Sequence, residues 1–367
     1  MLEGDAAVTN RERFRAIARG ELRGELFLPL NLNYSWFMAE TLERWHAEGL
    51  PPDADPAAAF DLQPVRMVGG APYSLLPPSP EETLAEDETT RTFRDGCGVV
   101  QRVFKRETGS KMPQWLDYPI KRREDWLRLR QRLDPETPER YPADWAAARQ
   151  SWEARDAPLG LAPGSFFGHT LQRWVGTENL CLLFYDDPAL VEEMLEYLEW
   201  FFLALATRYL AQGFTFDYAS FGEDIAYKGR AFISPAMFRR FLQPRYVRLC
   251  ETMRAHGIET IFVDSDGDVS ELIPLWLEVG INGFSPLEVA AGMDALALRR
   301  QYGDRVVLAG NIDKRALIAG RGAIDAEVER VRRLLELGRY FPAVDHSVPQ
   351  DVAYDHFRYL LDGLRSL

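Results

Sequence analysis

The later part of the chain alternates short apolar runs with longer stretches of helical length. Each run ends in polar residues, most of them acidic, amide or imidazole side chains. The runs lie at residues 216–224, 260–268, 280–288, 305–313 and 339–346. Such runs, each followed by a helical stretch, are typical of βα units in a parallel sheet. The pattern predicts an α/β protein with five or six βα units after Leu159.

The first 50 residues show a weaker form of the same pattern. After a loose tail over residues 1–8, Thr9 precedes the helical segment TNRERFRAIARGE. A Ser, Thr, Asp or Asn before a periodic segment is a helix start signal. Residues 25–33 then predict a first strand, and residues 36–49 predict the helix that follows it.

Residues 71–150 differ from the rest and predict an insertion that decorates the barrel. Residues 83–94 and 99–106 predict a β-hairpin or small meander, and 119–141 predict a charged amphipathic helix with its exit loop. No GxGxxG motif opens the first βα unit, which disfavours a Rossmann-type fold. We therefore expect residues 1–367 to form a single α/β domain. Its fold would be a (β/α)8 TIM barrel with an N-terminal β-hairpin and helical insertion.

Composition excludes several classes of protein. The net charge of −13 and the pI of about 5.0 argue against binding to nucleic acid or to an anionic membrane surface. The N-terminus has no apolar signal-peptide core, and the longest apolar stretch, near residues 195–210, is interrupted by charges. Three cysteines share no metal or redox spacing. We expect a cytoplasmic protein with reduced thiols.

The strand-end residues predict one pocket, because the carboxyl ends of parallel barrel strands meet at the face where such barrels keep their chemistry. The residues expected to be catalytic are Glu223, Asp224, Asp264, Asp266 and His346. The residues expected to bind a small-molecule substrate are Asn33, Tyr34, Trp36, His169, Glu288, Asn311 and Asp313. The aromatic residues after the first strand suit a neutral or aromatic ligand better than a polyanion.

Several of these residues also have a purely structural interpretation. Asp268 suits a helix N-cap, and a calcium loop is excluded because Val269 and Leu275 stand where glycine and glutamate are needed. A buried carboxylate at Glu223 or Asp224 would have a raised pKa and act as a general acid or base. The alternative is a salt bridge to a nearby cation. Asn311 and Asp313 equally suit a turn and a helix cap.

The chain resembles the uroporphyrinogen decarboxylase superfamily. The resemblance lies in the first helix and in residues 222–246, 260–294, 305–313 and 342–364, and it covers most of the chain after Leu159. It implies a barrel enzyme of cytoplasmic type, often homodimeric. The same superfamily holds zinc-dependent methyltransferases that move methyl groups between corrinoid proteins and thiols.

Two departures from the decarboxylases narrow the function that the resemblance implies. Their Arg-Gln-Ala-Gly-Arg-Tyr motif after the first strand, which meets substrate carboxylates, is replaced by residues 31–36 without arginine. An octa-anionic substrate would then leave carboxylates unpaired. The family's pocket tyrosine falls near Gln172, which the resemblance adds to the substrate-binding set. The family's late histidine is matched at His346.

The methyltransferases' zinc motif is also altered. Their His-x-Cys pair becomes Asp264-Ser265-Asp266, and their later cysteine falls near His346. Zinc prefers soft thiolates when it activates a thiol. Two carboxylates and an imidazole can still hold a divalent ion, so Asp264, Asp266 and His346 form a possible zinc site. A metal-free acid–base cluster is the alternative.

Three functions follow from this resemblance. The first is a methyltransferase or demethylase that acts on a small methylated substrate and passes the methyl group to a corrinoid protein. The second is a metal-free decarboxylase of an electron-rich ring acid, in which an aspartate stabilises the protonated intermediate. The third is a non-catalytic binding protein, which would need an exposed apolar patch away from the barrel mouth.

Overall fold

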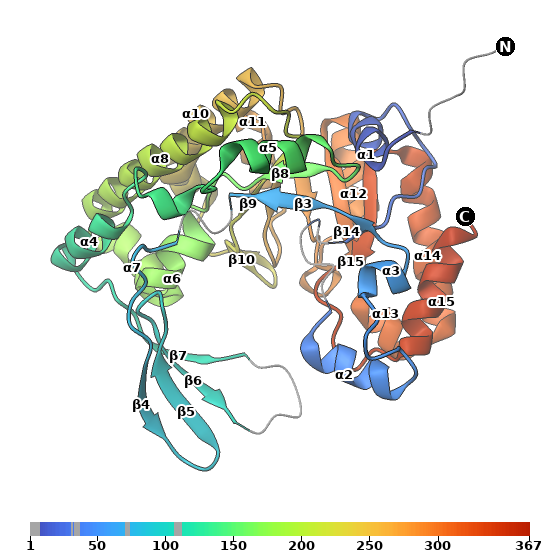
Figure 1. Ribbon diagram of the computed structural model, residues 1–367, viewed down its shortest axis with the longest axis horizontal. Helices are drawn as coiled ribbons and strands as arrows, with labels where there is room; N and C mark the ends of the chain where they lie inside the picture. The colour runs from blue at the N-terminus through green and yellow to red at the C-terminus, as the bar shows by residue number, and fades with distance from the viewer. Residues whose placement is uncertain (1–7, 31, 33–36, 70–73, 106–111) are drawn as a thin grey trace.

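The structure is a computed structural model, and it describes residues 8–30, 32, 37–69, 74–105 and 112–367 (Figure 1). Its central element is a curled, parallel, seven-stranded sheet with the strand order β15-β14-β13-β12-β9-β8-β3. The strands are β3 (Arg66–Val68), β8 (Leu159–Leu161), β9 (Tyr218–Gly222), β12 (Ile261–Asp264), β13 (Gly283–Ser285), β14 (Val307–Ile312) and β15 (Tyr340–Val344). The apolar runs of the sequence form these strands because both faces of the sheet are covered.

A short parallel pair lies next to this sheet. In it β1 (Pro29–Leu30) is hydrogen-bonded to β2 (Gln63–Pro64), which directly precedes β3. The arrangement is that of a TIM-like α/β fold, as the sequence predicts. Closure into a ring of eight strands stays a prediction. The first strand is much shorter than the expected segment 25–33.

The helices that the structure describes lie mostly on the outside of the sheet (Figure 1). They are α1 (Asn10–Arg19), α2 (Ala39–Ala47), α3 (Pro56–Ala59), α4 (Arg123–Leu129), α5 (Trp145–Glu153), α6 (Arg173–Val175), α7 (Thr177–Asp186), α8 (Pro188–Leu210), α9 (Pro235–Met237), α10 (Gln243–Ala255), α11 (Ile273–Val279), α12 (Ala295–Tyr302), α13 (Lys314–Ala319), α14 (Arg321–Leu337) and α15 (Tyr354–Arg365). Two π-helical segments, η4 (Phe167–Gln172) and η5 (Phe238–Leu242), lead directly into α6 and α10. Among the described residues, none of these helices is both long and apolar enough to cross a membrane.

Helix α1 packs its apolar face against the inside of the curled sheet. Thr9 caps this helix through the Glu12 backbone amide, and the Glu12 side chain returns the bond to Thr9, as the sequence predicts. Phe14 stacks on Phe341 of β15 at 4.6 Å between ring centroids and lies 5.3 Å from Tyr218 of β9. These residues belong to a small buried cluster of their own. The candidate site lies at the opposite end of the sheet.

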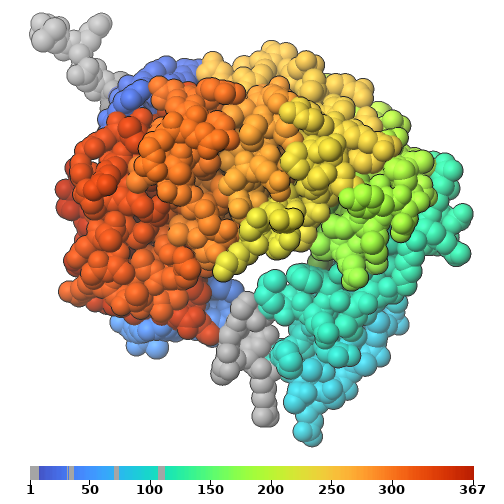
Figure 2. Space-filling view, turned by 180° about the vertical axis from the view of Figure 1, so that it is seen from behind, coloured from blue at the N-terminus to red at the C-terminus, as the bar shows by residue number. Residues whose placement is uncertain are grey.

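The segment before β8 forms a separate antiparallel sheet that projects from the rest of the molecule (Figure 1). Its strands follow one another as β4 (Glu82–Glu86), β5 (Thr90–Arg94), β6 (Val100–Phe104) and β7 (Gln114–Asp117). Viewed from behind, a hollow separates this cyan segment from the yellow residues beyond β9 (Figure 2). In the stretch predicted as a charged helix with its exit loop, α4 ends at Leu129, and the short 3-10 segments Arg130–Arg132 and Pro138–Arg140 follow.

Candidate functional site

Four side chains that the sequence singles out meet where the strands end. His169 lies on η4 after β8, Asp224 follows β9, Asp266 follows β12 and His346 follows β15. Nε2 of His346 lies 3.2 Å from Oδ2 of Asp266, and Nε2 of His169 lies 3.9 Å from Oδ2 of Asp224. The backbone amide of Asp266 also donates to Oδ1 of Asp224 at 3.4 Å. The site is therefore built from two linked Asp–His pairs.

Burial and neighbouring charges in the two pairs favour the protonated forms of Asp224 and His346. Burial raises the pKa of Asp224, and the neighbouring Asp266 carboxylate raises it further, while His169 and His346 oppose the shift. The hydrogen bond to Asp266 raises the pKa of His346 above its ordinary value. Oδ1 of Asp266 is buried and has no hydrogen-bond partner among the described residues.

A pocket of about 320 Å³ opens beside these pairs. It is lined by Trp115, Tyr118, Gly168, His169, Gln172, Arg173, Thr177, Asp224, Ala226, Phe232 and Asp266. Its volume is at the lower end of the range for small-molecule sites. His346 contacts Asp266 but is not among the described residues that line the pocket.

Two predicted substrate residues, His169 and Gln172, line this pocket from η4. The sequence placed His169 in a glycine-rich turn, whereas the structure places it on a helix directly over the end of β9. A Cβ atom at Gly222 would lie 2.8 Å from Cδ2 of His169, so only glycine leaves room for the imidazole. The Gln172 side chain donates to the hydroxyl of Thr177 at 2.8 Å.

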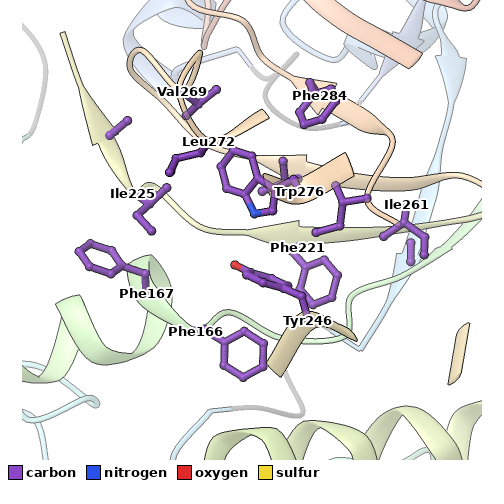
Figure 3. Packing of buried hydrophobic residues seen from close by; sticks show 14 of the residues in the cluster. Phe166, Phe167, Phe221, Ile225, Tyr246, Ile261, Val269, Leu272, Trp276 and Phe284 are labelled. Carbon is purple, nitrogen blue, oxygen red and sulfur yellow. The ribbon is translucent and has the colours of Figure 1, made fainter. Parts of the chain in front are cut away.

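Glu223 lies beneath the pocket instead of lining it. Its carboxylate accepts hydrogen bonds from the backbone amides of Phe166 at 2.8 Å and Phe167 at 2.7 Å. Burial raises the pKa of Glu223 to about 7. Figure 3 shows Phe166, Phe167 and Tyr246 packed in the buried apolar cluster. Glu223 therefore fixes the start of η4, the helix that carries His169, and is a positioning residue.

The Glu223→Gln variant is expected to change how stability depends on pH. Because the pKa of Glu223 is raised, the folded protein keeps a proton that the unfolded chain loses above about pH 4.5. Wild-type stability should therefore fall relative to the variant as the pH rises from about 4.5 to about 7, by on the order of 3 kcal/mol. Urea unfolding at several pH values measures this difference. The exposed Glu278→Gln variant is the control. The expectation would be contradicted if the difference in unfolding free energy between wild type and variant changed no more over this pH range for Glu223→Gln than for Glu278→Gln.

Asp264 is buried behind the pocket, where it accepts a hydrogen bond from the Ser285 hydroxyl at 3.3 Å. The predicted zinc ligands Asp264, Asp266 and His346 therefore do not form one ligand set. Among the described residues, no three His, Cys, Asp or Glu side chains are grouped as a metal ion requires. A zinc site with these ligands does not fit the arrangement, and no step is derived through a metal.

Three other predicted substrate residues make structural contacts. Glu288 accepts from the backbone amide of Gly267 at 3.4 Å and pairs with Lys314 at 3.4 Å, so it supports the turn that carries Asp266. Buried Asn311 donates to the carbonyl oxygen of Leu287 and accepts from the amide of Ala295. Asp313 caps α13 and pairs with Arg315. Strand-end position predicted that these residues lie near the mouth, but none of the three is among the described residues that line the pocket.

Some predicted substrate residues are not tested by the structure, and the pocket contains residues that the sequence did not predict. Asn33, Tyr34 and Trp36 lie outside the described residues. Arg173 carries a sequence signal that was overlooked, because it follows His169 by one helical turn. The aromatic residues Trp115 and Tyr118 come from the antiparallel segment, and no local pattern connects them to the strand ends.

The comparisons with known proteins agree with this architecture. Residues 161–367 match the family model for uroporphyrinogen decarboxylase (URO-D), so the chain belongs to that family. A methyltransferase from Methanosarcina mazei has a similar fold, with a TM-score of 0.61, 16% identity and 98% coverage of both chains.

A B12-independent methionine synthase from Shewanella sp. W3-18-1, in complex with selenomethionine, is far more distant. Its TM-score is 0.34 at 13% identity, over 60% of this chain and 64% of that chain. No curated protein sequence matches the chain. The comparisons thus establish the family and the fold, and the names of the family and of the Methanosarcina mazei protein are both those of enzymes.

Proposed function

We propose that the protein transfers a methyl group from a small methylated compound to a nucleophilic acceptor. The observation that carries this proposal is the Asp266–His346 pair, whose Asp266 lines a small pocket next to the Asp224–His169 pair. Methyl transfer needs alignment of donor and acceptor, and a proton for the leaving heteroatom. The two pairs supply the proton.

The reaction involves one bond to carbon broken and one formed. The bond between the methyl carbon and its heteroatom breaks, and the heteroatom keeps the electron pair. The His346 imidazolium gives up its proton, which the Asp266 carboxylate relays to this heteroatom, so the pair ends as a neutral imidazole beside a carboxylate. The acceptor supplies the electron pair of the new bond to the methyl carbon, and we propose a corrinoid carried by a partner protein in this role. Burial raises the pKa of Asp224, which favours its protonated form beside the pocket.

The family and the fold support an enzyme of this kind, and the pocket supports a small substrate. The assay incubates the protein with methyl ethers, methylamines and methyl thioethers, each with a corrinoid acceptor, and follows the methyl group by mass spectrometry. Methyl exchange with at least one donor class is expected. Failure across the whole panel would contradict the proposal. Near-stoichiometric metal in the purified protein, lost in Asp264→Ala/Asp266→Ala, would overturn the metal-free chemistry.

Decarboxylation of a ring acid is the second proposal, favoured by family membership and by the same protonated pair. Here the bond to the carboxylate carbon breaks and carbon dioxide leaves. The ring carbon keeps the electron pair and takes a proton from Asp266. Release of labelled carbon dioxide without any methyl exchange would favour this reaction over methyl transfer.

A further inference from the structure

The pocket wall away from the Asp–His pairs includes three aromatic residues. Trp115 lies on β7 and Tyr118 follows it, and Phe232 faces the same pocket from the segment after β11 (Arg230–Ala231). The Phe232 ring stacks with Phe167 at 6.1 Å and with Tyr227 at 5.2 Å between centroids. Rings held in this way favour a flat, aromatic ligand.

Arg173 adds a fixed guanidinium group to this wall. It pairs with Asp95, a buried carboxylate that also accepts from the amides of Cys97 and Val99 and from the side chain of Gln101. One third of the Arg173 side chain is exposed. Asp95 accepts a hydrogen bond from one terminal nitrogen of Arg173. The other N–H donors of the guanidinium group are therefore available to a ligand in the pocket that Arg173 lines. A guanidinium fork matches a carboxylate.

The spacing between the two ends of the pocket limits the size of the ligand. His169 and Arg173 are four residues apart on the continuous helical run formed by η4 and α6. Their side chains are thus about one helical turn apart, and both line the pocket. One ring with substituents at opposite ends spans such a distance.

We propose that the substrate is a single aromatic ring with a carboxylate at one end and a methoxy group at the other. The carboxylate binds Arg173, the ring packs among Trp115, Tyr118 and Phe232, and the ether oxygen reaches Asp266. This inference rests on the proposed methyl transfer and names its substrate class. It also favours demethylation over decarboxylation, because the carboxylate lies away from the proton donor. The products are the phenol, which takes the proton from Asp266, and the methylated acceptor.

Binding tests the substrate class without any turnover. Isothermal titration calorimetry would compare 4-methoxybenzoate with methoxybenzene, which lacks the carboxylate, and with cyclohexanecarboxylate, which lacks the aromatic ring. The wild-type protein should bind 4-methoxybenzoate about 10- to 100-fold more tightly than either analogue. Equal binding of all three ligands, or no binding of 4-methoxybenzoate, would overturn the inference.

Variants of Arg173 locate the carboxylate. Arg173→Gln should lose about 10- to 100-fold in affinity for 4-methoxybenzoate and should bind methoxybenzene unchanged. Arg123→Gln, which removes an exposed arginine of α4, should bind both ligands as the wild type does. If Arg173→Gln does not fold, Arg173→Lys keeps the charge beside Asp95 and should still lose affinity for the carboxylate. An unchanged preference for 4-methoxybenzoate in the Lys variant would contradict the assignment.

The two proposals fail in different ways. Tight, Arg173-dependent binding of 4-methoxybenzoate without methyl transfer would contradict the proposed function and leave the ligand class standing. Methyl transfer from aliphatic donors alone would support the proposed function and overturn the ligand class.

Discussion

Replacing Asp266 by alanine is expected to lower the rate of methyl transfer by about 10²- to 10⁴-fold, the usual contribution of a general acid. Asp266 is the pocket residue that contacts His346, and its Oδ1 atom has no other partner among the described residues. Steady-state kinetics would show the loss in kcat, with a smaller change in KM. An equal loss in Asp268→Ala, a turn residue two positions along the chain, would contradict a specific role for Asp266.

The pH profile distinguishes the role of His346 from a purely structural one. The proton on the Asp266–His346 pair is lost as the pH rises through the raised pKa of His346, so wild-type activity should fall on the alkaline side. His346→Gln should lower the rate by a smaller factor than Asp266→Ala, and this alkaline fall should disappear. The exposed His256→Gln should keep the wild-type profile. An unchanged profile in His346→Gln would contradict proton transfer through this pair.

The same pair contributes to stability with a defined sign. Because the pKa of His346 is raised in the folded protein, its stabilising contribution is present below its ordinary value of 6.5 and is lost as the pH rises through the folded value. Activity and this part of the stability should therefore decline over the same pH range. Both depend on one proton shared with Asp266.

Gly310→Ala is expected to destabilise the protein by about 4 kcal/mol, through backbone strain and a steric clash. Gly310 on β14 has φ +92°, and a Cβ atom there would lie 2.1 Å from the carbonyl oxygen of Pro286. That oxygen also accepts the backbone amide of Asn311, which the clash would displace. Thermal or denaturant unfolding measures the loss.

Gly322→Ala is the matched control for this substitution. Gly322 lies in α14, and a Cβ atom added there meets nothing within 4 Å. Alanine should stabilise this exposed helical position by about 0.5–1 kcal/mol relative to glycine. Similar effects at the two positions would contradict the requirement for glycine at Gly310.

Strand-end position identified the neighbourhood of the site but not every member of it. Glu223 and Asp224 are neighbours at the end of β9, yet the first is buried under the pocket and the second lines it. Likewise, Asp264 is buried against Ser285, whereas Asp266 lines the pocket. Short-range sequence patterns predict only that the backbone of these residues lies where the strands end. The direction of each side chain depends on turn geometry, such as the φ of +38° at Asp224.

By itself, the sequence determined the α/β class, the parallel order of the late βα units and the cap of the first helix. Those features depend on apolar periodicity and on contacts within a few residues. Only the tertiary structure decided that Trp115 and Arg173 share a pocket with Asp266, or that Asp95 holds the guanidinium in place. Residues so far apart in the chain meet because whole elements pack together, and no local pattern encodes that contact.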